Sequence, residues 1–186
     1  MFAEKILQTM WQIDMKVPQG YTITQATADH VPLLAAIEVA AAGIFPPGSI
    51  PEYIRSDSTP IEPLLEAVED GLLWVALAGD GKPVGYALVQ MVADAALLAQ
   101  MDVHPDHMRK GIGSALVMQV VEHLRLLKKP ELYLTTFVHV PWNAPLYAKL
   151  GFAAINSADT PSFLKDILEE ERLCGLTDRI AMRLVV

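Results

Sequence analysis

The chain has 186 residues, of which 52% are hydrophobic and 19% charged, a balance that excludes an intrinsically disordered chain and fits one domain. Its formal net charge of −8 argues against a general nucleic-acid binder, which would be basic, and favours cationic or neutral small partners. No apolar run approaches the ~18 residues of a membrane span, and the first residues do not resemble a signal peptide. Cys174 is the only cysteine, so we expect a cytoplasmic protein without disulfide bonds.

The first half of the chain predicts a strand, a helix, a long loop and a second helix. Residues 21–25 alternate like a short strand, and 27–43 place apolar residues at helical spacing. Residues 45–60 hold four prolines, which predicts a loop. Residues 63–71 then predict a short helix that ends at a glycine.

The second half begins with a hairpin, because Asp80-Gly81 separates two apolar runs. A buried strand follows at 95–103. The remaining elements alternate, with helices at 114–129, 142–150 and 162–171 and strands at 131–140 and 179–185. This order predicts an α/β (α+β) fold with a mixed sheet flanked by helices. We expect an N-terminal arm, 1–20, and a single domain, 21–186.

The most informative segment runs from Val103 to Ser114, where a predicted strand leads through a loop into a helix. Gly111 and Gly113 would let an anion reach the unpaired N–H groups of the helix N-terminus. Arg109 and Lys110 add positive charge to an otherwise acidic chain. The pattern favours a phosphate or pyrophosphate site, although a plain strand-to-helix turn with solvated charges has the same spacing.

Other phosphate loops fit less well. The P-loop string Gly-x-x-x-x-Gly-Lys-Ser/Thr is absent, and a dinucleotide fingerprint needs a small residue where Leu116 stands.

A metal-dependent hydrolase is an alternative interpretation of the same loop, which contains Asp102, His104, Asp106 and His107. Further ligands would have to come from downstream histidines that lie in a helix or a strand, so we expect no metal site.

Two motifs together resemble one family. Val103-x-Pro105 followed by Arg109-Lys110-Gly111-Ile112-Gly113-Ser114 is similar to the acetyl-CoA signature of the GNAT family of N-acetyltransferases. The segment from Asn143 through Tyr147 to Gly151-Phe152 resembles the family's second block, in the family's order. The resemblance covers residues 21–186.

The resemblance implies a mostly antiparallel sheet in which strands 95–103 and 131–140 splay apart, with acetyl-CoA as acetyl donor between them. It implies cofactor contacts from the end of the first strand, the glycine loop and the second block: Met101, Asp102, Val103, Met108, Arg109, Lys110, Gly111, Ile112, Gly113, Ser114, Asn143 and Tyr147. Tyr147 is implied as the acid that protonates the departing thiolate. Met108 departs from the family's Gln or Arg, and Gln100 stands where many relatives have a glutamate base.

Acetyl transfer to a primary amine of a small molecule or peptide needs a proton acceptor, because an alkylammonium has a pKa of ~10. We expect His139 to be this base, with Asp102 and Glu38 as the other candidates. Aromatic and imidazole side chains are the candidates for substrate contact: Phe45, Trp74, Tyr86, His139 and Trp142.

The missing glutamate leaves open a second function, a non-catalytic acyl-CoA-binding or sensing module, because Gln100 cannot accept a proton. No nucleic-acid or membrane partner is expected. A homodimer is plausible because the mean hydropathy is high, at +0.31.

Overall fold

A computed structural model describes residues 17–186, in which seven strands form one sheet. The predicted arm at 1–20 lies mostly outside the described residues. The strand order is β1-β2-β3-β4-β5-β7-β6. The strands are β1 (Tyr21–Gln25), β2 (Leu73–Ala78), β3 (Pro83–Val92), β4 (Ala95–Val103), β5 (Glu131–Phe137), β6 (Ala153–Ala154) and β7 (Arg179–Val185). All neighbouring pairs are antiparallel except β4 and β5, which confirms the mixed, mostly antiparallel sheet.

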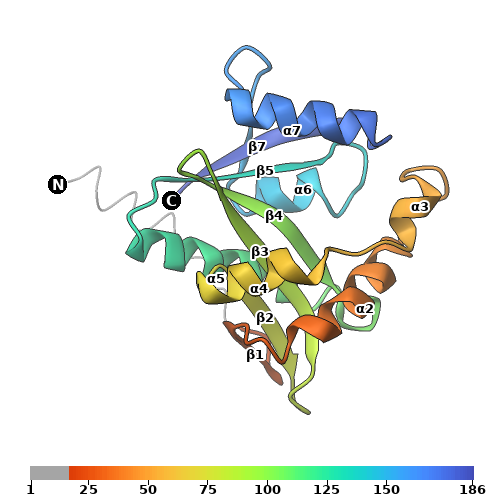
Figure 1. Ribbon diagram of the computed structural model, residues 1–186, viewed down its shortest axis with the longest axis vertical. Coiled ribbons are helices and arrows are strands. Elements are labelled where there is room, and N and C mark those ends of the chain that lie inside the picture. The colour runs from red at the N-terminus through yellow and green to blue at the C-terminus, as the bar shows by residue number, and fades with distance from the viewer. Residues whose placement is uncertain (1–16) are drawn as a thin grey trace.

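Helices cover both faces of this sheet (Figure 1). They are α2 (Val31–Ala42), α3 (Glu52–Arg55), α4 (Ile61–Glu69), α5 (Ile112–Leu126), α6 (Ala144–Lys149) and α7 (Ser162–Leu173), with a 3-10 turn, η1 (Pro105–His107). Trp74 lies beside Ala87 in the β2–β3 ladder and packs against His123 of α5, with 5.5 Å between ring centroids. Tyr86, one residue along β3 from Ala87, hydrogen-bonds Glu38 of α2. Because successive strand residues face opposite sides, α5 and α2 lie on opposite faces.

Most predicted elements are confirmed, and the differences have local causes. The first helix begins at Val31, because 27–30 form a turn in which the Thr27 N–H donates to His30 Nδ1 at 3.0 Å. The proline-rich loop contains the short helix α3, and β5 ends at Phe137 rather than at residue 140. Strand β6 is only two residues long, too short to leave a periodic signal in the sequence.

The parallel strands β4 and β5 pair only near their beginnings, through Ala96–Leu132 and Leu97–Tyr133. A register shift between Leu88 and Val89 puts a bulge in the neighbouring β3–β4 ladder, and bulges bend and twist a strand locally. Beyond this point the two strands separate toward their carboxyl ends. The predicted splay is therefore confirmed, and it creates the site described next.

Candidate active site

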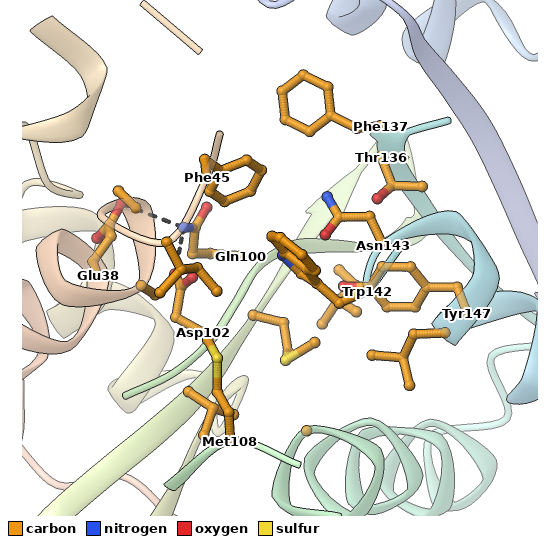
Figure 2. A pocket seen from close by; sticks show the side chains of 18 of the residues that line it. Glu38, Phe45, Gln100, Asp102, Met108, Thr136, Phe137, Trp142, Asn143 and Tyr147 are labelled. Carbon is orange, nitrogen blue, oxygen red and sulfur yellow. Dashed lines mark hydrogen bonds between the residues drawn. The ribbon is translucent and has the colours of Figure 1, made fainter. Parts of the chain in front are cut away.

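The space between the separating strands is a cavity of about 780 Å³. Its walls come from α2, α3 and the loop between them, from β4, the loop into α5, β5 and α6, and from the end of α7 through Leu176 to the start of β7. Figure 2 shows Glu38, Gln100 and Asp102 on one side of it and Tyr147 with Asn143 on the other. All but one of the predicted cofactor residues line this cavity; the exception is Lys110.

One end of the cavity is the N-terminus of α5, which begins after Gly111 at φ +87° and carries no side-chain cap. The first amides of the helix, at Ile112, Gly113 and Ser114, line the cavity without a capping side chain among the described residues. An uncapped helix N-terminus presents N–H donors and the positive end of the helix dipole. Gly113 packs tightly on β4, because a Cβ there would lie 3.3 Å from the Met101 sulfur.

The side chains of the two cations in this loop, Arg109 and Lys110, point in different directions. Arg109 lines the cavity. Lys110 turns away, and its Nζ donates to the Tyr21 hydroxyl at 3.2 Å and to the Asp106 carbonyl at 3.0 Å. The cationic charge at this end of the cavity therefore comes from Arg109 more than from Lys110.

The edge of β4 that faces the cavity has free backbone groups. The His104 N–H donates to the Val84 carbonyl at 2.8 Å, so His104 and the alternate residues Asp102 and Gln100 point their backbone groups toward β3. The backbone groups of Met101 and Val103 point the other way, where β5 no longer pairs with β4. An extended molecule with amide groups can add along such an edge.

A cluster of polar side chains occupies the face of β4 that looks toward α2. The Gln100 amide Nε2 bridges two carboxylates, at 2.6 Å from Asp102 Oδ2 and 3.4 Å from Glu38 Oε1. Glu38 also accepts from the Tyr86 hydroxyl at 2.9 Å. Its remaining donors are the N–H and the hydroxyl of Thr59, at 2.9 and 3.2 Å. Within residues 17–186, Glu38 thus accepts from four donors, whereas Asp102 accepts from one.

Burial raises the pKa of Asp102 to about 7, with a further contribution from the negative charge of Glu38, while the Gln100 hydrogen bond opposes both. A carboxyl group that titrates near neutrality and lines a cavity is a candidate general base. The Gln100 side chain, which itself cannot accept a proton, donates to this carboxyl group and holds it in place.

Tyr147 faces the same cavity from α6. Its ring packs edge-on against Phe152, with 5.6 Å between centroids. Burial raises its pKa above the ordinary value of 10.0, and Asp102 adds to the increase. The hydroxyl therefore keeps its proton at neutral pH, as a general acid must, and no hydrogen bond to it forms within residues 17–186.

The predicted substrate residues divide into two groups. Phe45 and Trp142 line the cavity and pack together, with 6.1 Å between ring centroids, and Phe45 also packs against Phe137 at 5.7 Å. Trp74 is buried beneath α5 on the other face of the sheet, away from the cavity. The prediction that Trp74 contacts the substrate was wrong. Every residue of β2 is apolar, so the sequence does not show which side chains of this strand face the cavity.

Tyr86 and His139 also differ from their predicted places. Tyr86 is fully buried behind Glu38 and reaches the site only through that carboxylate. His139 follows the end of β5, where its side chain is exposed and its ring stacks edge-on against Phe137 at 5.7 Å. His139 is not part of the cavity wall, so its geometry gives less support to a role as base than that of Asp102.

A second polar group in the cavity wall escaped the sequence analysis. The Arg179 guanidinium donates to Glu171 at 2.7 Å and to the Thr135 hydroxyl at 2.9 Å, and it covers the Phe137 ring at 4.7 Å. Thr135 in turn donates to Glu171 at 2.6 Å. These residues come from β5, α7 and β7, and no sequence motif connects them.

The side chains of the alternative metal site point in different directions. Asp102 bonds Gln100 inside the cavity, His104 Nδ1 accepts from the Asp106 N–H at 3.3 Å, and His107 Nδ1 pairs with the Tyr21 hydroxyl at 2.9 Å. Within residues 17–186, no group of three or more His, Cys, Asp or Glu side chains could hold a metal ion. The same residues include no helix that is both long and apolar enough to span a bilayer.

Residues 43–152 match the model of the acetyltransferase (GNAT) family. The chain belongs to this family. Its α7 and β7 lie outside the matched residues.

Curated relatives and solved structures agree with this assignment. The chain is 33% identical over 76 residues to the [ribosomal protein bS18]-alanine N-acetyltransferase of Escherichia coli K12. That match covers 41% of this chain and 51% of the relative, so it spans about half the length of the relative.

Two solved structures share the fold over 89% of this chain. The PaiA N-acetyltransferase of Thermoplasma acidophilum, in complex with coenzyme A, has a TM-score of 0.65 at 19% identity, with 99% of its own chain covered. The ribosomal-protein-S18-alanine N-acetyltransferase of E. coli has a TM-score of 0.61 at 22% identity, with 94% covered. At these identities the likeness concerns the fold.

Proposed function

We propose that the protein transfers an acetyl group from acetyl-CoA to a primary amine, by direct attack of the amine within a complex of both substrates. One observation carries the proposal. The unpaired edge of β4 runs from the uncapped N-terminus of α5 to a carboxyl group, Asp102, whose pKa is about 7. This arrangement brings an open helix N-terminus, an unpaired strand edge and a carboxyl group of raised pKa into one cavity, which supports roles in binding phosphate, binding amides and accepting a proton.

The donor fits the residues present. The pyrophosphate accepts hydrogen bonds from the amides around Gly111 to Ser114, with Arg109 supplying positive charge. The pantetheine amides pair with the free backbone groups of Met101 and Val103. The Val103 N–H is the candidate donor to the thioester oxygen, which gains negative charge during attack.

Asp102 and Tyr147 then handle the protons. Asp102 accepts a proton from the acceptor ammonium, which frees the nitrogen lone pair to form the new C–N bond. After attack the nitrogen carries a positive charge and loses its second proton to solvent. The C–S bond breaks, Tyr147 donates its proton to the sulfur, and the tyrosinate regains a proton from solvent. Glu38 and Gln100 act through Asp102 by fixing its position and its pKa.

Binding and turnover test the proposal separately. Acetyl-CoA should raise the melting temperature at millimolar concentration, as a ligand of the native state must, whereas NAD should not. Release of free CoA thiol should then depend on an added amine. If acetyl-CoA does not bind, the proposal is overturned. If acetyl-CoA binds but no amine is acetylated, the protein is instead an acyl-CoA-sensing module.

The cytoplasmic location and the homodimer stay predictions from the sequence. The same holds for a contact between Asn143 and the donor, although Asn143 lines the cavity and leaves the N-terminus of α6 without a side-chain cap.

A further inference from the structure

Two segments that are far apart in the sequence meet over one end of the cavity. The Tyr53 hydroxyl of α3 donates to the Cys174 carbonyl after α7 at 2.7 Å. A Cβ on Gly175 would lie 3.0 Å from the Pro51 ring. In Figure 1, α3 lies beside the C-terminal end of α7. We call these joined segments, 50–55 and 174–176, the roof.

The roof is held firmly from both sides. On one side the Arg55 guanidinium donates to the carbonyls of Ala42, Phe45 and Pro46, at 3.1, 3.0 and 2.6 Å. This fixes the proline-rich loop against α3. On the other side Ile50 packs in one apolar cluster with Phe137 and Val140. Packed side chains and anchored loops therefore border this end of the cavity.

The chamber under the roof is apolar. Its walls are Ala42, Phe45, Ile50, Ile54, Phe137 and Leu176. The nearby cation, Arg179, is paired with Glu171 and donates to Thr135, so the Glu171 carboxylate balances its charge. The other charged groups on the α2 side of the cavity are the acidic Glu38 and Asp102.

We infer that the acceptor is a small primary amine with an uncharged apolar body, such as an alkyl or arylalkyl amine. Its ammonium group lies at Asp102, and its body fills the chamber under the roof. This inference rests on the proposed acetyl transfer and names the substrate class for it. A polypeptide N-terminus is disfavoured, because the roof borders the cavity on the side of the apolar chamber. An amino acid is disfavoured, because the Glu171 carboxylate already balances the charge of Arg179.

Three acceptors test the substrate class. They share a phenylethylamine skeleton and differ in the group beside the amine: none in 2-phenylethylamine, a carboxylate in L-phenylalanine, and a peptide chain in a hexapeptide that begins with phenylalanine. Thiol release from acetyl-CoA is measured with each. We expect kcat/KM for 2-phenylethylamine to exceed that for the other two by at least about 100-fold. Comparable or faster turnover of the peptide or of phenylalanine overturns the inference while leaving acetyl transfer intact. Failure of acetyl-CoA to bind, measured by calorimetry, overturns the proposed function itself.

A matched pair of variants tests the location. Ile54→Ala removes part of the chamber wall and should raise KM for 2-phenylethylamine about tenfold, with the Kd for acetyl-CoA unchanged. Ile61→Ala makes the same substitution at an exposed position of α4 and should leave both values unchanged. Equal KM values in the two variants overturn the placement of the amine under the roof.

Discussion

Replacing Glu38 by glutamine should make the enzyme active at lower pH. The change removes the negative charge that helps to raise the pKa of Asp102 while keeping a side chain of the same shape. Gln100 Nε2 lies 2.6 Å from one carboxylate oxygen and 3.4 Å from the other, so these oxygens are no more than about 6 Å apart. Two unit charges at that distance repel by about 3 kcal/mol at an effective dielectric constant of ~20, which corresponds to about two pKa units.

Burial is the largest cause of the raised pKa, and solvent in the cavity screens part of this repulsion, so we expect the pKa of Asp102 to fall from about 7 by about one unit. The assay is kcat/KM for the acceptor amine between pH 5 and pH 9. In the unchanged protein we expect kcat/KM to rise with pH as Asp102 loses its proton, to be half-maximal at about pH 7 and to level off about one pH unit higher. In Glu38→Gln the same rise occurs at lower pH.

Glu62→Gln is the matched control, because Glu62 is exposed in the first turn of α4 and its charge is screened by water. Its pH profile should match that of the unchanged protein. If the acid limb of the kcat/KM profile of Glu38→Gln lies within about 0.3 pH units of that of the unchanged protein, or at higher pH, two ideas are refuted: the coupling of the two carboxylates and the role of Asp102 as base.

Three further predictions concern the groups that handle protons and phosphate. Asp102→Asn should lower kcat by about 10²- to 10³-fold, yet it should stabilise the fold by about 2 kcal/mol at pH 8 in chemical denaturation. The reason is that the folded-state pKa of Asp102, about 7, lies above its ordinary value of 3.8. The stabilising contribution of Asp102 is therefore complete below pH 4 and is lost as the pH rises through 7. If the variant and the unchanged protein differ in free energy of unfolding by the same amount at pH 5 and at pH 8, this reasoning is contradicted. Tyr147→Phe should lower kcat about 10²-fold with little change in the Kd for acetyl-CoA, whereas an unchanged kcat would remove Tyr147 from the proton path. Arg109→Ala should raise that Kd about tenfold in calorimetry and Lys110→Ala only about twofold, since the Lys110 ammonium is engaged elsewhere; the reverse order would show that Lys110 turns toward the donor.

The sequence predicted the parts of the molecule that depend on local chemistry. The hairpin at Asp80-Gly81, the strand at 95–103 and the strand at 179–185 follow from turn residues and apolar patterning, and the structure has them. The glycine loop likewise follows from the need for an open helix N-terminus. These signals are short-range, so one sequence contains them in full.

The proton-handling cluster depends instead on contacts between distant segments. Nothing local distinguishes Glu38, on an Ala-rich helix, from a solvated glutamate, and its partners Thr59, Tyr86 and Gln100 come from three other segments. The increase in the pKa of Asp102 arises only when the fold buries it. The sequence could therefore name Asp102 and Glu38 as candidates, but it could not rank them above His139.

In the proposed reaction, strand β4 serves two substrates because its edge and its face are chemically different. Its edge toward β5 offers backbone groups of Met101 and Val103, which suits the amides of the donor regardless of side chain. Its face toward α2 carries Gln100 and Asp102, which act on the acceptor through their side chains. Because the acceptor chemistry depends on side chains and on a roof that lies partly beyond the family match, the acceptor can change in evolution while the donor site stays the same. This separation is how a chain that matches a ribosomal-protein acetyltransferase over 76 residues can, by our proposal, take a different acceptor.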